Sequence, residues 1–169
     1  EGRPELVKQV RTLMETINRM EGDTLPVSAF MDHVDGQFEH GASAYEKRGV
    51  AVTVPHWDES KCIQCNSCSF VCPHATIRPY ALNEEEIAAA PENIRLLDCK
   101  GKNAGDYKYT LAVSPLDCMG CGVCIGQCKP GALTMVPAEE ELAEQKVFNF
   151  CAKNVSVKEE LVGTNVMTS

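Results

Sequence analysis

Two cysteine-rich stretches decide the fold: CIQCNSCSFVCPHA at residues 62–75 and CMGCGVCIGQCKPGA at residues 118–132. Both have the spacing C-x2-C-x2-C-x3-C. An offset of 56 residues (118 minus 62) carries Cys62 onto Cys118 and each later cysteine of the first run onto its counterpart in the second. The same offset carries Ile77 onto Leu133. The repeat predicts two equivalent halves related by a pseudo-twofold axis.

Cysteine thiolates at this spacing bind [4Fe–4S] clusters in bacterial two-cluster ferredoxins, where the fourth cysteine of each run binds the cluster of the other run. We therefore assign one cluster to Cys62, Cys65, Cys68 and Cys128, and the second to Cys118, Cys121, Cys124 and Cys72. Such cross-ligation would tie the two halves together. No catalytic serine, histidine and acid set and no glycine-rich phosphate loop is recognisable, so the expected chemistry is electron transfer.

The ten cysteines could also form disulfides or bind structural zinc. A disulfide framework is disfavoured because the cysteines form two tight clusters, which favours metal ligation in a reducing compartment. The cysteines could instead bind structural zinc. Zinc sites, however, usually combine two separate C-x2-C motifs and do not place three closely spaced cysteines and a fourth in one run. Zinc stays open as an alternative at this point.

The segments around the cysteine runs predict an α+β chain. Apolar residues at three- and four-residue steps indicate a helix over 4–20, followed by an extended linker to about residue 47. The other expected elements are strands over 50–55 and 107–113, short strands over 75–77 and 131–136, a short helix over 83–91 with Asn83 as its N-cap, and a weakly patterned helical stretch over 136–154.

These elements suit a bacterial two-[4Fe–4S] ferredoxin-like fold with additions at both ends. The expected division is a helix and extended linker over 1–48, the ferredoxin-like domain over 49–137, and a C-terminal extension over 138–169. The sequence opens on Glu1 and not on Met, so a piece of a longer polypeptide is expected.

Several residues near the runs are candidates for tuning or covering a cluster. Trp57 precedes the first run and is expected to cover its cluster, while His74 is expected to pack there in an ordinary way. Lys129 stands where the first run has Pro73, and its positive charge would raise the reduction potential of the cluster bound by Cys128. We therefore expect the two clusters to differ in potential.

The glycines of the second run have two explanations. Positions 120, 122 and 126 are glycine, whereas the first run has Gln64, Asn66 and Phe70 there. Either the second cluster has less side-chain cover, or glycine satisfies special backbone angles. Outside the runs, Cys99 and Cys151 are expected to be free buried cysteines, and His33, His40 and His56 show no ligand spacing.

The overall composition limits the partners. The formal net charge is −8, with 24 acidic against 16 basic residues, which argues against nucleic-acid binding. No window approaches the length of apolar sequence that a membrane-spanning helix needs, and the first residues lack the apolar core of a signal peptide. A cytoplasmic protein with no membrane partner is expected.

Beyond the cysteines, the chain resembles one enzyme family. The stretches PVSAF, DGQFEHGASAYEKRGVAVTVPHW, CIQCNSCSFVCPHATIRP and SPLDCMGCGVC are similar to the linker and ferredoxin-type domain of pyruvate:ferredoxin (flavodoxin) oxidoreductase. The likeness runs from about residue 25 to residue 136, and NFCAKNVSVKEE resembles the family's exit toward its next domain. The YEKRG and VPHW stretches single out this family among ferredoxins.

The resemblance implies a conducting segment without a catalytic centre. The full enzyme would be a homodimer that oxidises pyruvate on thiamine diphosphate and magnesium and passes electrons to ferredoxin or flavodoxin. Its pyruvate-binding domains would precede residue 1, and its thiamine-binding domain would follow residue 169. The alternative is a free-standing two-cluster ferredoxin-like carrier, against which the long PVSAF to VPHW lead-in argues.

Overall fold

The structure, a computed structural model, describes residues 3–45, 49–101 and 103–161. It divides into two compact units, 1–48 and 49–169. Each unit is described by itself. In the described ranges, no helix has both the length and the apolar character that crossing a lipid bilayer requires.

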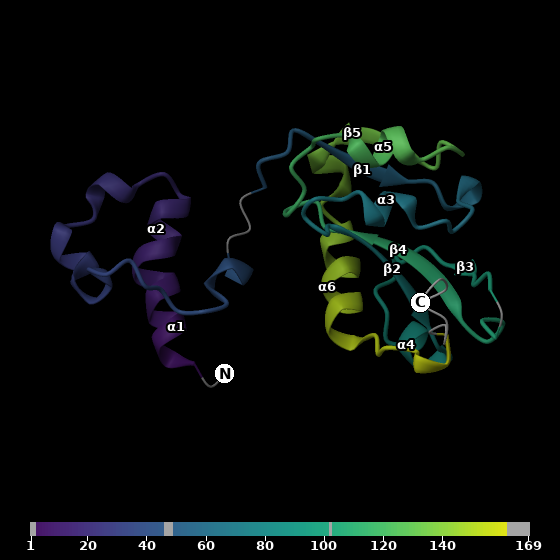
Figure 1. Ribbon diagram of the computed structural model, residues 1–169, viewed down its shortest axis with the longest axis horizontal. Coiled ribbons are helices and arrows are strands. Elements are labelled where there is room, and N and C mark those ends of the chain that lie inside the picture. Colours follow the sequence, from purple (N-terminus) through teal and green to yellow (C-terminus); the bar gives the residue numbers. More distant parts are fainter. Residues whose placement is uncertain (1–2, 46–48, 102, 162–169) are drawn as a thin grey trace. The chain divides into compact units, whose positions relative to one another are not determined.

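The first unit is built on one continuous helical segment (Figure 1). It consists of α1 (Pro4–Gln9), a π-helical turn (Val10–Met14) and α2 (Glu15–Asn18). The predicted helix is therefore confirmed, although it ends before Met20, which has a positive φ of 62°. The segment buries the apolar side chains of Leu6 and Leu13.

The stretch after this helix differs from the expected extended linker. It contains three short 3₁₀ helices, at Gly22–Thr24, Val27–His33 and Ala42–Tyr45. Gln9 anchors the return of the chain, because its buried side chain accepts a hydrogen bond from the backbone N–H of Glu39 at 2.9 Å. Composition alone could not show this contact, since the two residues are far apart in the sequence.

The second unit contains two small antiparallel sheets (Figure 1). One pairs β1 (Thr53–Trp57) with β5 (Leu133–Pro137), so that Trp57 lies opposite Leu133. The other has the order β2-β4-β3, with β2 (Ile77–Leu82), β4 (Lys108–Val113) and β3 (Leu97–Asp98). Ile77 lies opposite Val113 in this second sheet. Strands from before the first cysteine run and after the second thus pair with each other.

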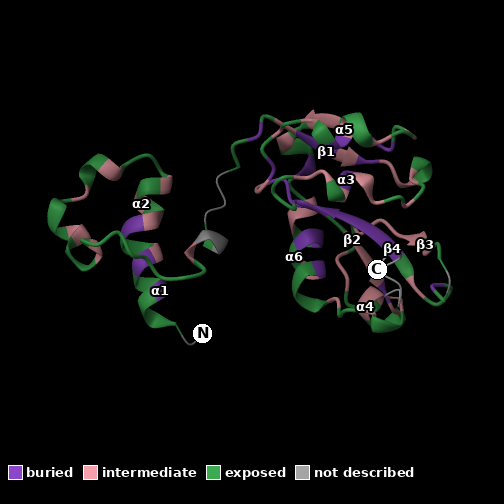
Figure 2. Ribbon diagram, in the orientation of Figure 1, coloured by how far each residue is buried: buried purple, intermediate pink, exposed green. Residues whose placement is uncertain are grey.

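The strands follow the apolar pattern, with two shifts in their bounds. The short strand expected over 75–77 instead begins at Ile77 and continues to Leu82. The strand expected over 50–55 instead begins at Thr53 and continues to Trp57, while Val50 and Val52 are exposed and precede it. Its pairing with β5 decides the bounds, because hydrogen bonds with that strand extend to Trp57. β4 confirms the expected strand, and it is buried on both faces from Tyr109 to Val113 (Figure 2).

Among its described residues, this unit also has four α-helices: α3 (Ser67–Phe70), α4 (Glu84–Ala88), α5 (Val123–Gln127) and α6 (Glu144–Asn154). Short 3₁₀ helices lie at Glu59–Lys61, Ala138–Glu141 and Glu159–Leu161. α4 begins at the predicted N-cap: the Asn83 side chain accepts from the Glu86 N–H at 2.9 Å, and Glu86 accepts from the Asn83 N–H at 3.0 Å. This reciprocal capping box satisfies two otherwise unpaired donors.

α6 covers the face of β4 that is turned away from the cysteine runs. Its buried residues Val147, Phe148 and Cys151 pack with Ala112 of β4. A separate core includes Trp57, Ile77, Tyr109, Leu111 and Leu133, and several cysteines of the two runs belong to it or pack against it. The cysteine loops are therefore supported by the main apolar core.

Candidate iron–sulfur centres

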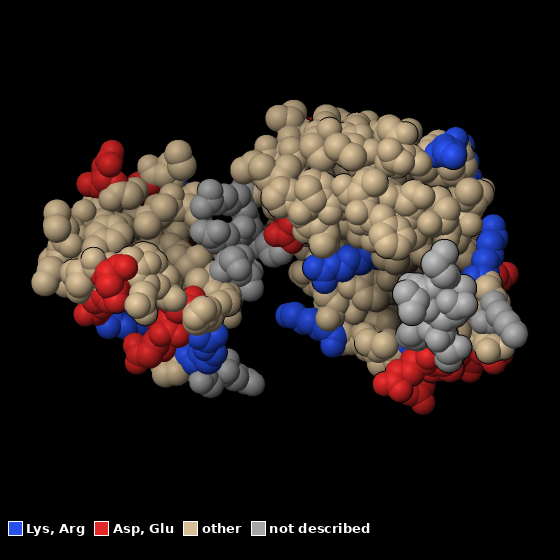
Figure 3. Space-filling model, viewed as in Figure 1, with Lys and Arg blue, Asp and Glu red and all other residues tan. Residues whose placement is uncertain are grey.

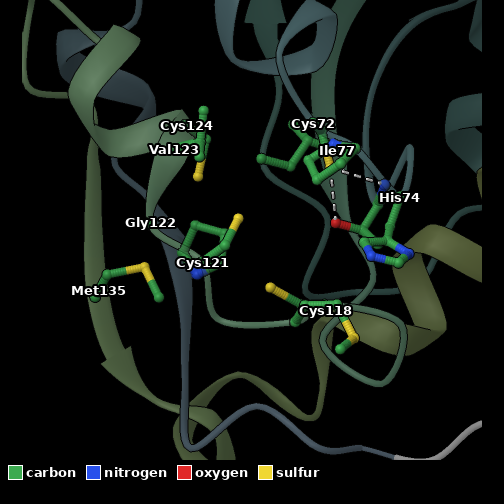
Figure 4. Close-up of a pocket in the computed structure, with 13 residues that line it drawn as sticks. Cys72, His74, Ile77, Cys118, Cys121, Gly122, Val123, Cys124 and Met135 are labelled. Carbon is green, nitrogen blue, oxygen red and sulfur yellow. Dashed lines mark hydrogen bonds between the residues drawn. The ribbon is translucent and has the colours of Figure 1, made fainter.

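Two of the pockets in the second unit each gather four cysteines. The Cys118 pocket is lined by Cys118, Cys121, Cys124 and Cys72 and holds about 360 Å³, counting the part open to solvent. The sulfur atoms of these four side chains point toward the same space (Figure 4). The Cys62 pocket is lined by Cys62, Cys65, Cys68 and Cys128 and holds about 320 Å³ on the same measure.

Each pocket takes three cysteines from one run and the fourth cysteine from the other. These are the two groups of four that the motif predicts. Over the described ranges, no three His, Cys, Asp or Glu side chains converge closely enough to hold a single metal ion. The cysteines are instead spread around the walls of the pockets, which is the arrangement that a multi-atom metal group requires.

The local backbone of the two runs explains how the cysteines reach the pockets. The third cysteine of each run lies in a short helix, Cys68 in α3 and Cys124 in α5, and both are buried. Before each helix, two residues adopt the left-handed backbone conformation, with φ between 58° and 71°. They are Gln64 and Asn66 in the first run and Gly120 and Gly122 in the second. These turns bend the loop back around its pocket.

Neighbouring atoms, and not the backbone angle, explain why position 120 is glycine. Gln64 and Asn66 adopt the same conformation without being glycine, so the backbone angle alone does not require one. At Gly120, however, a Cβ atom would lie 3.1 Å from the carbonyl oxygen of Thr53 and 3.4 Å from Cβ of Ala51. At Gly122 nothing lies within 4 Å. Close approach to Ala51 and to Thr53, the first residue of β1, is the reason at Gly120.

Backbone N–H groups donate to the cysteine sulfurs in matched pairs. The Gln64 N–H points to Cys62 Sγ and the Gly120 N–H to Cys118 Sγ, both at 3.4 Å. The Thr76 and Ala132 N–H groups donate to Cys72 Sγ at 3.3 Å and to Cys128 Sγ at 3.2 Å. Such donors stabilise thiolate charge, which ligands to iron carry.

The buried cysteines resist ionisation as free thiols. Burial, together with the charges of neighbouring cysteines, raises the pKa of Cys68 to about 12. The same causes raise the pKa of Cys124 to about 11. A bound cationic group supplies the compensating charge that several crowded thiolates need, so the donor set fits a metal centre.

The Cys62 pocket has two further features. Hydrogen bonds from Ser67 lower the pKa of Cys65, and the positive charge of Lys129 acts in the same direction. The expected position of Lys129 beside this pocket is thus supported. Trp57 lines the same pocket, as expected, and its ring meets Tyr109 edge-on at 6.1 Å between centroids.

The indole nitrogen of Trp57 also bears on what this pocket can hold. Trp57 Nε1 is buried and has no hydrogen-bond partner among the described residues. An unpaired buried N–H costs about 1–3 kcal/mol. A sulfur atom of a group bound in the adjoining pocket would be a chemically suitable acceptor, and this again agrees with an iron–sulfur centre.

The other residues considered from the sequence lie elsewhere. His74 borders the Cys118 pocket with an exposed side chain. His56 contacts Glu141 at 2.6 Å and His33 stacks on Phe38, and neither lines a cysteine pocket. His40 lies in the first unit, where its carbonyl oxygen accepts from Arg3 at 2.6 Å.

The two remaining cysteines also lie outside both pockets. Cys151 is fully buried under β4, as expected for a free core cysteine. Cys99 is only partly buried, and it packs at the edge of the main core. Neither is positioned to replace a cysteine of the two runs.

Sequence reasoning missed two supports of the site. Arg95 donates to the Trp57 carbonyl and to Glu144 at 3.0 Å, which ties β1 to α6. The Thr76 hydroxyl lies 3.3 Å from Cys72 Sγ. The sequence signal for Thr76 is its position four residues after Cys72. The equivalent residue of the other half, four residues after Cys128, is Ala132, which has no hydroxyl.

Charge is unevenly distributed over this unit. Figure 3 shows acidic side chains gathered over the end where α4 lies, and its first turn contains Glu84, Glu85 and Glu86. On the same face, the surface over β1, β5, α3 and α5 is largely uncharged among the residues shown in colour. Carboxylates are thus concentrated away from the cysteine pockets in this view, and this limits repulsion of the thiolates.

Two protein-family models match parts of the chain. A model called EKR, described as a domain of unknown function, matches residues 1–51. A model described as a 4Fe-4S binding domain matches residues 54–77, which include the first cysteine run.

Several characterised proteins are similar over most of the chain. A pyruvate:ferredoxin oxidoreductase of Moorella thermoacetica is 48% identical over 158 residues, or 92% of the chain. Pyruvate-flavodoxin oxidoreductases of Enterobacter agglomerans and Klebsiella pneumoniae are 48% and 51% identical over 83% and 70% of the chain. The chain spans only 13%, 12% and 10% of the lengths of these three relatives.

The matched 4Fe-4S model and the cysteine geometry agree with the names of these relatives. Over most of its length, the chain is therefore similar to one segment of the pyruvate:ferredoxin and pyruvate-flavodoxin oxidoreductases, and it includes a match to a 4Fe-4S binding domain.

Proposed function

We propose that this chain is an electron-conducting segment of a pyruvate:ferredoxin or pyruvate-flavodoxin oxidoreductase and that it holds two [4Fe–4S] clusters. One observation carries the proposal: two pockets each gather four cysteines, three from one run and one from the other. Cys62, Cys65, Cys68 and Cys128 would bind the first cluster, and Cys118, Cys121, Cys124 and Cys72 the second.

Two equivalent halves support the two-cluster count. The offset of 56 residues carries β1 onto the last five residues of β4, α3 onto the start of α5, and the start of β2 onto β5. The left-handed residues and the N–H donors to sulfur correspond at the same offset. We infer a ferredoxin-like fold with a pseudo-twofold repeat.

When bound, such clusters take up and release one electron at a time with little rearrangement of their ligands. The residues of this chain supply the rest. The eight cysteines would hold the clusters, and all of them but the exposed Cys65 and Cys121 belong to apolar cores or pack against them. The backbone N–H groups would stabilise negative charge on sulfur, and Trp57 and Ile77 would restrict water. No group among the described residues is proposed to act on pyruvate.

The positive charge near one cluster favours a difference in potential. Lys129 acts on Cys65 of the first site, and the equivalent position of the second site is Pro73. Because reduction adds negative charge, a nearby cation stabilises the reduced state. The order of electron flow between the two sites would follow from the measured potentials.

The division of labour in the longer enzyme is also a proposal. We assign residues 1–48 to a helical linker unit, 49–137 to the cluster-binding domain and 138–169 to an extension toward another domain. The chain spans 10–13% of the lengths of these three relatives, which supports a role as one segment among several. The other domains would bind pyruvate, thiamine diphosphate and magnesium, the enzyme would be a homodimer, and ferredoxin or flavodoxin would accept the electrons.

Metal analysis tests the core of this proposal. The 169-residue chain, reconstituted anaerobically with iron and sulfide, should bind about eight of each and show a broad visible absorption band. A protein that binds zinc and no sulfide would overturn it in favour of a structural zinc protein. The segment alone should not oxidise pyruvate when thiamine diphosphate and coenzyme A are added, and turnover would refute the assignment as a conducting segment.

A free-standing carrier is the second candidate, because both pockets lie within one compact unit. Joining the segment to the rest of its enzyme distinguishes the two. A conducting segment should restore electron transfer from pyruvate only when it is part of the complete polypeptide, whereas a carrier should do so when it is added as a separate protein.

A further inference from the structure

The hydrogen bonds to cysteine sulfur are nearly the same in the two pockets, and one residue, Thr76, makes an additional contact. Thr76 follows Cys72 by four residues, and Ala132 follows Cys128 by four. The backbone N–H of each donates to the sulfur of the preceding cysteine, at 3.3 and 3.2 Å. Only Thr76 adds a second contact, from its hydroxyl oxygen to Cys72 Sγ at 3.3 Å. Both bonds to Cys72 are drawn in Figure 4.

The position of Thr76 holds its hydroxyl in place. Its side chain is only 2% exposed, and its carbonyl oxygen accepts from the Ser114 N–H at 2.8 Å, just beyond the paired residues of β2 and β4. Its β-branched side chain has few rotamers to choose from. The hydroxyl is thus fixed beside the sulfur by backbone pairing and by burial, and not by flexible surface contacts.

Chemistry decides the direction of this hydrogen bond. A hydroxyl can donate or accept, but a thiolate that binds iron has no proton to give. With metal-bound Cys72, the Thr76 O–H must be the donor. A donor to a ligand sulfur stabilises the more negative, reduced state of the centre and raises its reduction potential.

We propose that Thr76 is a positioning and tuning residue: its hydroxyl raises the reduction potential of the centre bound by Cys72 and Cys118, a contribution for which Ala132 has no equivalent in the other half. This inference rests on the proposed pair of clusters. It also means that a different device raises the potential at each site, the hydroxyl at one and the positive charge of Lys129 at the other.

Three variants separate hydrogen bonding from packing. Thr76→Val keeps the branched shape and loses the hydroxyl, Thr76→Ser keeps the hydroxyl, and Ala132→Ser introduces one at the equivalent position. Each 169-residue chain is reconstituted with iron and sulfide, and its metal content is measured first. Potentials are then obtained by titration with dithionite and redox mediators, followed by electron paramagnetic resonance.

Thr76→Val should shift one of the two reduction waves to a lower potential and leave the other in place. Thr76→Ser should keep the wild-type value, and Ala132→Ser should raise the wave that Thr76→Val does not move. The deuterium shift of the iron–cysteine stretches in resonance Raman spectra should become smaller in Thr76→Val, in which only the backbone N–H still donates to Cys72 Sγ. An unchanged potential in Thr76→Val, or equal shifts in the Val and Ser variants, would overturn the inference.

The metal analysis distinguishes a failure of the proposed function from a failure of the proposed role of Thr76. If the wild-type chain lacks two clusters, the proposed function fails. If it holds both and Thr76→Val leaves both waves in place, only the role of Thr76 fails.

Discussion

The Nζ atom of Lys158 lies 2.7 Å from Oε1 and 2.8 Å from Oε2 of Glu86, and the two side chains are only 8% and 10% exposed. Glu86 also accepts from the Ser156 N–H at 2.9 Å and closes the capping box of α4. One carboxylate therefore joins the start of α4 to the segment that follows α6.

Removing Lys158 should destabilise this unit strongly. In Lys158→Met the Glu86 carboxylate stays buried without its cation, and breaking such a pair costs about 3 kcal/mol or more. The free energy of unfolding, measured by denaturant titration at fixed metal content, checks this. Lys153→Met, at an exposed position of α6, is the control and should change it by less than about 0.5 kcal/mol. Equal effects of the two variants would contradict the expected role of the pair.

The same pair predicts how stability depends on pH. Burial opposes the charge of Glu86, but bonds from Lys158, Ser156 and Asn83 outweigh it and lower the pKa to about 2 from 4.5. A lowered pKa in the folded state gives stability that is complete above pH 4.5 and lost as the pH falls toward 2. The difference in unfolding free energy between wild type and Glu86→Gln should shrink over that interval. A difference that grew on acidification would oppose this account.

Two glycines of the second cysteine loop should respond differently to alanine. Both Gly120 and Gly122 have positive φ, so each alanine costs on the order of 1 kcal/mol of backbone strain. Only at Gly120 would the new Cβ also press on the Thr53 carbonyl oxygen, at 3.1 Å. Gly120→Ala should thus unfold at a clearly lower denaturant concentration than Gly122→Ala, and it should lower the cluster content of the Cys118 pocket. Similar losses in both variants would show that contact with Thr53 does not matter.

The proposed binding of Cys72 to the cluster of the other cysteine run predicts which cluster a Cys72 variant should lose. Cys72→Ser should damage the cluster of the Cys118 pocket more than that of the Cys62 pocket, because its sulfur lines the former. Cys128→Ser should show the reverse, and Cys151→Ser should spare both. Iron and sulfide content, with the electron paramagnetic resonance signals of each centre, measure the outcome. Loss of the Cys62 centre in Cys72→Ser would instead mean that each run binds its own cluster.

The cysteine grouping could be predicted from sequence because ligand spacing and a repeat of constant offset are local facts. The α4 cap at Asn83 and the strand leading to Val113 were equally readable, since capping and alternation act over a few residues. These features need no knowledge of distant partners.

The failures arose where distant contacts decide the structure. β1 ends at Trp57 and not at Pro55 because β5 pairs with it, and the stretch after α2 coils into 3₁₀ helices that composition did not reveal. The Arg95 contacts with β1 and α6, and the Thr76 hydroxyl at Cys72, likewise depend on tertiary placement. Glycine at position 120 was ambiguous until the segment at Thr53 was placed beside it.

The pairing of β1 with β5 has a consequence for biosynthesis. Residues of both strands line both pockets: Pro55 and Met135 in one, Trp57 and Leu133 in the other. A ribosome makes β1 first and β5 last among the strands, so neither pocket has its full wall until Leu133 and Met135 have left it. If the proposed clusters form in these pockets, we expect iron to be inserted only after the whole cysteine repeat has been translated. A nascent chain stalled between the two runs would then carry thiols without a complete site around them.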